Sequence, residues 1–309
     1  MSGEAKVRWV EVTEDEAGQR IDNYLLARLK GVPKSHVYRI VRSGEVRINS
    51  KRVQASRKIA AGDRIRVPPV RVAERDDASP APHYKLPILF EDDHLLAIDK
   101  PAGIAVHGGS GVAHGVIESL RSMRPEARFL ELVHRLDRET SGVLLIAKKR
   151  SALTALHEKL RSRDVDKRYL VGVAGRFRNE KQRVRLALAK RAAADGGKRV
   201  SVSDEGQEAE TIFRLLERRD DASLLEAELL TGRTHQIRVH LAHLKHPVLG
   251  DDRYGDFELN RALRKRGLKR MFLHAARLGF AHPARDERMV IESKLPADLS
   301  RFWERSKAA

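Results

Sequence analysis

The sequence predicts an α+β fold divided into a small N-terminal domain and a larger second domain with a mixed or mainly antiparallel sheet. Strand-like and helical runs follow one another without the regular strand–helix–strand alternation of a parallel α/β fold. Residues 73–85 are rich in alanine, proline and acidic side chains, a composition typical of a linker. The expected domains are therefore residues 18–72 and 86–309, and a chain of 309 residues can bury a hydrophobic core.

The chain is strongly basic. Its formal net charge is +18 and its isoelectric point is about 10.3. Between residues 18 and 71, 14 lysines and arginines stand against three acidic residues, so much of the excess lies in the N-terminal domain. A charge of this size favours a polyanionic partner, which is a nucleic acid or, as the alternative, an acidic membrane surface.

Three absences exclude whole classes of protein. The sequence has no run of 18 apolar residues, so no transmembrane helix is expected. The N-terminus lacks the apolar core of a signal peptide, which argues against export. The chain has no cysteine, which excludes disulfides, thiolate zinc sites and a cysteine nucleophile. Together these observations predict a cytoplasmic protein without a membrane partner.

The N-terminal domain is expected to form two short helices and a small sheet. Apolar residues recur at helical spacing in two groups, which are Ile21, Leu25, Leu26 and Leu29, and then Val37, Ile40 and Val41. Ser35 is the expected N-cap of the second helix. Alternating residues predict strands over 44–49 and 62–67, with a turn at Asn49-Ser50 after the first.

The order of these elements resembles the S4 RNA-binding domain. The resemblance rests on the strings QRIDNYLLARL, SGEVRINSKRV and AAGDRIRV. It implies contact with the RNA backbone through phosphates, which positions the protein without specifying a base sequence. The candidate contacts are Lys34, Arg39, Arg42, Arg47, Lys51 and Arg52. The alternative is a solvated basic surface without a ligand.

The larger domain is expected to be rich in strands. The strand-like runs are PILFEDDHLLAIDK, VLLIAKK, RYLVGVAG, ETIFRLLER and SLLEAELL. Two helices are expected over 151–163 and 233–244, the first capped by Ser151. Residues 189–210 break the periodicity, which predicts either a mobile loop or a hairpin.

Three sequence patterns are similar to the motifs of other protein classes, but each lacks a residue or a spacing that its class requires. HRLD is similar to the H-R-D loop of protein kinases, but Leu136 intervenes and position 142 is glycine instead of asparagine. AVHGGSGV lacks the last glycine of a hydrolase nucleophile elbow, because Val112 stands there. A third group of side chains has neither the spacing nor the acidic helper of a zinc site, so no metal is expected; it consists of His235, His240, His243 and His246.

Asp137 is the strongest candidate for chemistry. It lies between two arginines in LVHRLDRETSGVLLIAKK, between two apolar strand-like shoulders. The plain interpretation is a turn aspartate paired with Arg135 or Arg138. However, the positive potential of a basic chain favours the ionised carboxylate, which can act as nucleophile or base. The strand-like runs on both sides of Asp137 would also hold the side chain on rigid elements.

The strings HRLDRETSGVLLIAKK, KRYLVGVAG, TGRTHQIRVHLAHLKHPVLGDDRYG and RMFLHAARLGF resemble the successive motifs of the RluA-type pseudouridine synthases. The resemblance implies an isomerase that converts uridines to pseudouridines in 23S (large ribosomal subunit) rRNA or its precursor, without a cofactor or metal. A monomer is expected, because the basic surface has an RNA to meet. The alternatives are a catalytically silent rRNA-binding assembly factor and a different site specificity within the family.

The resemblance also implies roles for individual residues. Asp137 corresponds to the essential aspartate of the family, and Tyr169 to the tyrosine that stacks on the uracil and takes part in deprotonation at C5. Arg233 corresponds to the basic partner of the aspartate, and Leu273 to the apolar floor beneath the base. Arg135 is expected to enter the RNA helix in place of the flipped uridine. His134 and Thr140 are expected to hold the turn.

Overall fold

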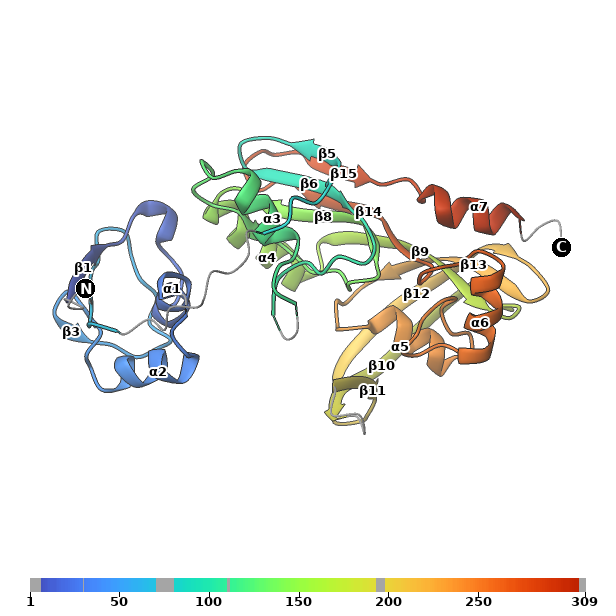
Figure 1. The fold of residues 1–309 in the computed structure, drawn as a ribbon, viewed down its shortest axis with the longest axis horizontal. Helices are drawn as coiled ribbons and strands as arrows, with labels where there is room; N and C mark the ends of the chain where they lie inside the picture. The colour runs from blue at the N-terminus through green and yellow to red at the C-terminus, as the bar shows by residue number, and fades with distance from the viewer. Residues whose placement is uncertain (1–6, 30, 71–80, 110–111, 193–197, 306–309) are drawn as a thin grey trace. The chain divides into compact units, whose positions relative to one another are not determined.

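The computed structural model describes residues 7–29, 31–70, 81–109, 112–192 and 198–305 (Figure 1). The chain divides into two compact units, Met1–Pro80 and Ala81–Ala309, which are described separately below. Most of the predicted linker, residues 73–80, lies outside the described residues. No helix in the described part of the chain is both long enough and apolar enough to cross a bilayer.

The N-terminal unit packs two helices against a small antiparallel sheet. The helices are α1 (Ile21–Arg28) and α2 (Lys34–Arg42). The strands are β1 (Arg8–Glu11), β2 (Arg47–Ile48), β3 (Lys51–Arg52) and β4 (Arg64–Val67), in the order β1-β4-β2-β3. The core contains the apolar residues that predicted the helices, including Ile21, Leu25, Val37 and Ile40, all of which are at most 1% exposed.

Of two local predictions for this unit, the turn at Asn49-Ser50 is confirmed and the helix cap at Ser35 is wrong. Asn49 and Ser50 both have positive φ angles, 49° and 66°, which confirms the predicted tight turn between β2 and β3. The prediction of Ser35 as the cap of α2 was wrong, because Pro33 is the N-cap and Ser35 lies inside the first turn. The Pro33 carbonyl accepts the N–H groups of His36 and Val37 at 3.0 and 3.1 Å, so the helix begins there without a side-chain cap.

The C-terminal unit is built on one large sheet. Its main path runs β11-β10-β12-β13-β9-β14-β8-β6-β5, with β15 beside β14 and β7 beside β8. The strands are β5 (Ile88–Glu91), β6 (Leu95–Lys100), β7 (Glu131–Leu132), β8 (Ser141–Ala147), β9 (Val165–Ala174), β10 (Lys181–Ala192), β11 (Lys198–Val202), β12 (Gln207–Arg218), β13 (Ala222–Leu229), β14 (Leu273–Ala281) and β15 (Arg288–Glu292).

Of the described strand pairs, β8 and β14 are the only parallel one, and they lie between β9 and β6 in the sheet. This arrangement confirms the predicted α+β class, since the strands are joined mainly by antiparallel pairing. Every strand-like run of the sequence forms a strand, and PILFEDDHLLAIDK forms the hairpin β5–β6. Residues 189–210 contain the hairpin β10–β11, so the hairpin alternative is confirmed (Figure 1).

Helices pack on both faces of the sheet. They are α3 (Val116–Met123), α4 (Arg150–Ser162), α5 (Gln236–His243), α6 (Phe257–Lys265) and α7 (Ala297–Arg305). Leu144 and Ile146 of β8 belong to the same core cluster as residues of α3 and α5, whereas Val143 and Leu145 pack with α4. Burial on both faces explains why β8 reads as a continuous apolar run. The predicted Ser151 cap was wrong, because Lys149 is the N-cap of α4.

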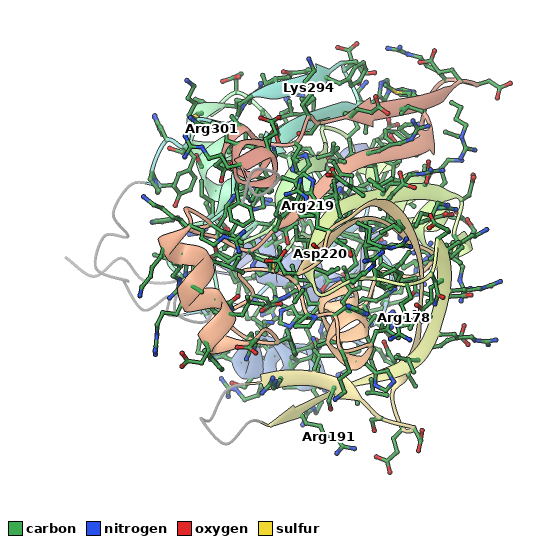
Figure 2. All side chains as sticks on the ribbon, turned by 90° about the vertical axis from the view of Figure 1, so that its right-hand side faces the viewer. Arg178, Arg191, Arg219, Asp220, Lys294 and Arg301 are labelled. Atoms are coloured by element: carbon green, nitrogen blue, oxygen red, sulfur yellow. The ribbon has the colours of Figure 1, made fainter. Side chains whose placement is uncertain are left out.

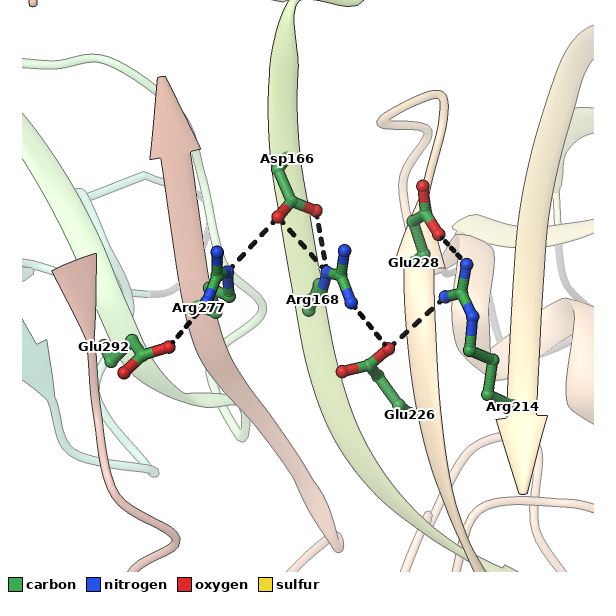
Figure 3. A network of polar contacts seen from close by, with 7 residues as sticks. All are labelled: Asp166, Arg168, Arg214, Glu226, Glu228, Arg277 and Glu292. Carbon is green, nitrogen blue, oxygen red and sulfur yellow. Dashed lines mark hydrogen bonds and ion pairs between the residues drawn. The ribbon is translucent and has the colours of Figure 1, made fainter. Parts of the chain in front are cut away.

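Polar side chains mark one face of the sheet across five neighbouring strands (Figure 3). Ion pairs link these strands in an alternating row of seven residues, which are Glu292, Arg277, Asp166, Arg168, Glu226, Arg214 and Glu228. Because successive side chains of a strand point to opposite faces, Tyr169 lies on the other side of β9 from Arg168. The row therefore identifies the face turned away from Tyr169.

The last helix, α7, contacts Arg219 in the connection between β12 and β13. Arg219, labelled in Figure 2, donates to the Trp303 carbonyl at 2.5 Å, and its guanidinium carbon lies 3.7 Å from the centre of the Trp303 ring. The indole N–H of Trp303 donates to Glu217 at 2.7 Å. A guanidinium stacked on an aromatic face adds to the burial of the apolar side of α7.

Candidate active site

A cavity of about 980 Å³ opens beside the loop that precedes β8. The loop itself, α4, the end of β13 and the start of α5 line it. All five site residues predicted for the larger domain lie on its wall, namely Arg135, Asp137, Tyr169, Arg233 and Leu273. Residues more than a hundred positions apart in the sequence thus meet in one concave site.

Asp137 lies on a tight turn that leads into β8. The Thr140 N–H donates to the Asp137 carbonyl oxygen at 3.1 Å and closes the turn. Gly142 follows with a φ of 110°, and a Cβ at this position would lie 2.2 Å from the Ala275 carbonyl oxygen. Only glycine permits this approach, because β8 and β14 pair in parallel at these two residues. The pairing brings β14 close to the Asp137 turn.

One oxygen of Asp137 is bound by a fixed arginine. The Arg238 Nη1 donates to Asp137 Oδ2 at 2.9 Å. Its Nε and Nη2 donate to the two oxygens of Asp251 at 2.7 and 2.8 Å, a bidentate pair. The Asp251 side chain is fully buried, and that of Arg238 is 11% exposed. Arg238 is therefore held by Asp251 and presents its remaining edge to Asp137.

The charges of this triad stabilise one another. Burial alone would disfavour the charge on Arg238, but the hydrogen bonds and charges of Asp251 and Asp137 raise its pKa above the ordinary value. Burial likewise acts against the Asp251 carboxylate, yet the Arg238 guanidinium and the N–H groups of Arg253 and Tyr254 lower its pKa. Both groups are consequently charged across the physiological pH range.

The partner of Asp137 is therefore Arg238 and not Arg233, which corrects the expectation drawn from the resemblance. Arg233 lies on the same cavity, but its Nε donates to the Glu208 carbonyl at 3.1 Å, and it makes no ion pair with Asp137 in the described part of the chain. The physical reason is helix geometry. Arg233 precedes α5 and lies on the other side of the N-cap His235, whereas Arg238 is in the first turn and faces the loop before β8.

Tyr169 and Leu273 form an apolar side of the cavity. They are 9% and 4% exposed, and Ala275 and Val171 are their respective partners in the β14–β9 pairing. Two-residue spacing therefore places both side chains on one face of the sheet. Burial, and next the charge of Asp137, raise the pKa of Tyr169 well above its ordinary value, so the phenol is neutral.

The adjacent side chains of Arg135 and His134 point in different directions. Arg135 is exposed at the cavity and makes no ion pair with the described residues. His134 turns inward, where its Nε2 accepts the Leu145 N–H at 3.2 Å. Burial lowers the pKa of His134 to about 4, so the imidazole is neutral and ties the turn to β8.

A buried lysine fixes the other end of the loop. Lys100, at the end of β6, is fully buried and donates to three carbonyls, those of Pro101, Ile104 and Arg138, at 2.8, 2.8 and 3.1 Å. The Arg138 carbonyl also accepts the Gly103 N–H at 2.9 Å. The residue directly after Asp137 is thus held by two donors, which limits movement of the turn that carries Asp137.

Lys100→Met is expected to change the pH dependence of stability. Burial lowers the pKa of Lys100 to about 7 in the folded protein, so between pH 7 and 9 the unfolded chain binds a proton that the folded chain releases. Wild-type stability should therefore rise by about 2 kcal/mol relative to the variant over this window. Urea unfolding at both pH values measures the difference, with the exposed Lys181→Met as control. An equal difference at both pH values would contradict the assignment.

The four histidines around α5 have separate surroundings. His235 contacts Tyr254, His246 contacts the Ala174 carbonyl at 2.8 Å, and His240 is fully buried. Among the described residues, three potential metal ligands converge elsewhere, at Asp92, His94 and His282. Lys149 and Arg285 approach this group at 3.3 and 3.1 Å, and such cations disfavour a metal ion there.

The six basic residues proposed for RNA contact are all exposed, and none pairs with a carboxylate in the described part of the chain. Lys34, Arg39 and Arg42 lie on α2. The other three, Arg47, Lys51 and Arg52, lie on β2 and β3. Arg47 and Arg52 are directly opposite one another in the β2–β3 pair. Like charges in this position repel, and a polyanion would relieve the repulsion.

Sequence reasoning missed three members of the site. Arg238 lies in the string TGRTHQIRVH, but two arginines compete there and only the position of the helix start distinguishes them. Asp251 and Tyr254 lie in the string GDDRYG, which the sequence marks as a turn without indicating its contacts. Their proximity to Asp137 depends on the return of the chain after α5.

Comparison with known proteins agrees with this architecture. A family model described as RNA pseudouridylate synthase matches residues 94–243, and the S4 domain model matches residues 19–65. Ribosomal large subunit pseudouridine synthase C of Escherichia coli K12 is 52% identical over 98% of both chains. The protein of the same name from Haemophilus influenzae is 51% identical, over 94% of this chain and 92% of its own.

A solved structure supports the fold of the larger unit. Human RNA Pseudouridylate Synthase Domain Containing 4 superposes with a TM-score of 0.60 at 27% identity, covering 72% of this chain and 93% of the human one. Near-complete coverage by relatives above 50% identity includes both the cavity and the N-terminal unit. The chain therefore belongs to the RNA pseudouridylate synthase family and carries an S4 domain ahead of its synthase domain.

Proposed function

We propose that this synthase converts specific uridines of large-subunit ribosomal RNA to pseudouridine, with Asp137 as the catalytic carboxylate. The observation that carries the proposal is the asymmetry of this side chain. Arg238 binds Oδ2, while Oδ1 has no hydrogen-bond partner among the described residues. A charged oxygen that is oriented but not neutralised at a cavity wall is suited to attack or to proton abstraction.

The reaction makes limited demands on the protein. The bond between N1 of uracil and C1′ of ribose breaks, the base turns, C5 bonds to C1′, and the C5 proton leaves. In the proposed assignment, Oδ1 of Asp137 acts first. Tyr169 stacks on the uracil, and Leu273 provides the apolar surface under it, so the detached base stays in the cavity. The isomerisation conserves all atoms except the exchanged proton, so no cofactor is proposed.

The uridine has to leave the RNA stack to reach Asp137. Base flipping costs a few kcal/mol of unstacking. Arg135 is exposed at the mouth of the site and free of ion pairs with the described residues, so its planar guanidinium is available to stack in the gap. We therefore assign Arg135 to the engagement of RNA and not to the chemical step.

Large-subunit rRNA is proposed as the partner because several relatives above 50% identity are named ribosomal large subunit pseudouridine synthase C. The net charge of +18 suits such a polyanion. Residues 18–72 are proposed to bind RNA phosphates and 86–309 to carry the chemistry, with 73–85 as the linker. We further propose a cytoplasmic monomer that acts on the rRNA or on a precursor of the large subunit.

Charge removal on the N-terminal unit is expected to weaken RNA binding without altering its specificity. Arg47→Gln combined with Arg52→Gln should reduce the slope of log K against log salt by about 1.5, since each phosphate contact contributes about 0.7 to 0.9. Arg28→Gln is the matched control, because Arg28 pairs with Glu16 and is already neutralised. Filter binding to rRNA over a salt series measures the slopes. Equal slopes for the wild type and the double variant would contradict the assigned RNA surface.

Tritium release tests the proposed activity. Wild-type protein should release tritium from large-subunit rRNA that carries 5-tritiated uridine, since the C5 proton is lost during rejoining. Small-subunit rRNA prepared in the same way is the control substrate and should release little. Binding of the large-subunit rRNA without release would instead favour a silent assembly factor. Equal release from both RNAs would contradict the proposed substrate.

A further inference from the structure

His235 stands beside the free oxygen of Asp137. Its Nε2 lies 3.8 Å from Asp137 Oδ1, the oxygen that Arg238 does not bind. His235 is the N-cap of α5 with φ 56° and ψ 20°, a left-handed conformation that is uncommon for residues other than glycine. Strained backbone of this kind is concentrated at functional sites. The imidazole is 15% exposed and lines the cavity.

The other ring nitrogen is held by Tyr254. His235 Nδ1 and Tyr254 Oη are 2.8 Å apart, and the Val200 N–H of β11 donates to the same hydroxyl oxygen at 3.1 Å. The best use of the single hydroxyl proton is then donation to Nδ1. A neutral imidazole that accepts at Nδ1 carries its proton on Nε2, the nitrogen that faces Asp137.

Tyr254 is itself fastened to the β10–β11 hairpin. Its ring lies under the guanidinium of Arg199 from β11, with 5.2 Å between the guanidinium carbon and the ring centre. Arg199 also donates to the Arg253 carbonyl at 2.8 Å. Arg238 lies 5.0 Å from the same ring centre. Tyr254 thus contacts the hairpin, the partner of Oδ2 and the residue that faces Oδ1.

We propose that His235 is a positioning residue for the catalytic carboxylate, held by the β10–β11 hairpin through Tyr254 in the tautomer that presents Nε2–H to Asp137 Oδ1. Arg238 and His235 then orient the two carboxylate oxygens from separate sides. The distance of 3.8 Å between His235 Nε2 and Asp137 Oδ1 is longer than a hydrogen bond. Oδ1 therefore keeps its lone pairs available for reaction while His235 faces it. The proposal rests on the proposed role of Asp137.

The charges around His235 agree with a neutral ring. The groups that face it are Asp137 from the loop before β8, Arg238 from α5, and Asp251 and Arg253 from the turn after α5. Burial lowers the pKa of His235, and the two arginines add to this effect, whereas the two aspartates oppose it. Loss of the Tyr254 hydroxyl would free Nδ1 to take up a proton, and an imidazolium beside Oδ1 would hold the carboxylate in an ion pair.

Nitrogen-15 NMR of the histidine rings tests the arrangement without any assay of activity. Wild-type His235 should show the Nε2–H tautomer, and Tyr254→Phe should shift its ring towards Nδ1 protonation. The exchange keeps the aromatic ring that Arg199 and Arg238 contact and removes only the hydroxyl. Tyr84→Phe is the control for a tyrosine remote from the hairpin. An Nδ1–H tautomer in the wild type would overturn the proposal.

Kinetics then separate positioning from a structural role. Glutamine reaches as far as Nε2, so His235→Gln should keep most of the single-turnover rate. Asparagine tolerates the left-handed backbone but is too short, so His235→Asn should lose about tenfold or more with RNA affinity unchanged. Retention by Asn and loss by Gln would show a purely structural role and overturn the proposal.

The pH dependence of the single-turnover rate is the third test of the proposal. In Tyr254→Phe, the acid limb of the single-turnover rate should move to higher pH, because His235 becomes easier to protonate. An acid limb that stays in place would overturn the proposed link. A wild type that releases no tritium from rRNA would contradict the proposed function instead, and the tautomer measurement would still decide whether the hairpin holds His235.

Discussion

Asp137→Asn is expected to lower the single-turnover rate of pseudouridine formation by about 10⁴-fold or more, while the protein remains folded and still binds rRNA. Asparagine has the shape of aspartate but carries no charge and is neither a nucleophile nor a base of comparable strength. Arg238 keeps its bidentate pair with Asp251, so the change leaves no buried charge without a partner. The loss should therefore be chemical and not structural.

Rapid-quench tritium release with enzyme in excess over rRNA measures this rate, and filter binding measures the affinity. Glu139→Gln is a matched control, since it removes an exposed carboxylate two residues away whose one ion pair among the described residues is with Arg138 at 3.5 Å. The control should stay near the wild-type rate. A similar loss in both variants would indicate that negative charge on the loop matters generally and that Asp137 has no special part.

Arg238→Met should be both inactive and unstable. Methionine fills part of the space but leaves the fully buried carboxylate of Asp251 without its partner, and breaking a buried pair in this way costs about 3 to 5 kcal/mol. Asp137 also loses its only hydrogen-bond donor among the described side chains. Urea unfolding measures the stability, and tritium release measures the activity.

A second substitution separates these two effects. Asp251→Asn combined with Arg238→Met removes the unpaired charge, so the double variant should regain much of the stability but none of the activity. Recovery of activity together with stability would show that Arg238 acts only through the fold. The same result would contradict its assignment as the group that orients Asp137.

The pair also predicts a pH dependence. Burial acts against the Asp251 carboxylate, but Arg238 and backbone donors lower its pKa in the folded protein. A carboxylate with a lowered folded pKa contributes stability that is present above its unfolded pKa, near 4, and is lost as the pH falls through the folded value. In Arg238→Met the same carboxylate is buried without the arginine, which raises its folded pKa, while the unfolded pKa is the same in both proteins. The stability difference between wild type and Arg238→Met should therefore shrink as the pH falls from the raised pKa of Asp251 in the variant through its lowered pKa in the wild type.

Much of the fold could be predicted because local pattern and tertiary packing agree. The apolar run of β8 is buried on both faces, and the alternation of β2 and β4 matches a sheet with one face on the helices. The predicted helix caps were wrong, since Ser35 and Ser151 are good caps in isolation but the N-cap of each helix lies two residues earlier. Cap position depends on the preceding loop, which periodicity does not describe.

The site was predictable only in part. Tyr169 and Leu273 lie within strands, and Asp137 lies on the short turn that leads into β8, so local motifs indicate which side chains can face the cavity. Arg233 and Arg238 are five residues apart around a left-handed N-cap at His235, and no spacing rule for a regular helix describes that turn. Which arginine faces Asp137 follows from the chain reversal, a feature that only the three-dimensional structure supplies.

Mapping of pseudouridines in large-subunit rRNA tests the central claim most directly. Cells that lack this gene would be complemented with the wild type or with Asp137→Asn, and carbodiimide-dependent stops of reverse transcription would be compared. The account predicts that the wild type restores stops at specific uridines of large-subunit rRNA and that Asp137→Asn restores none of them. Restoration of the same stops by Asp137→Asn would contradict it.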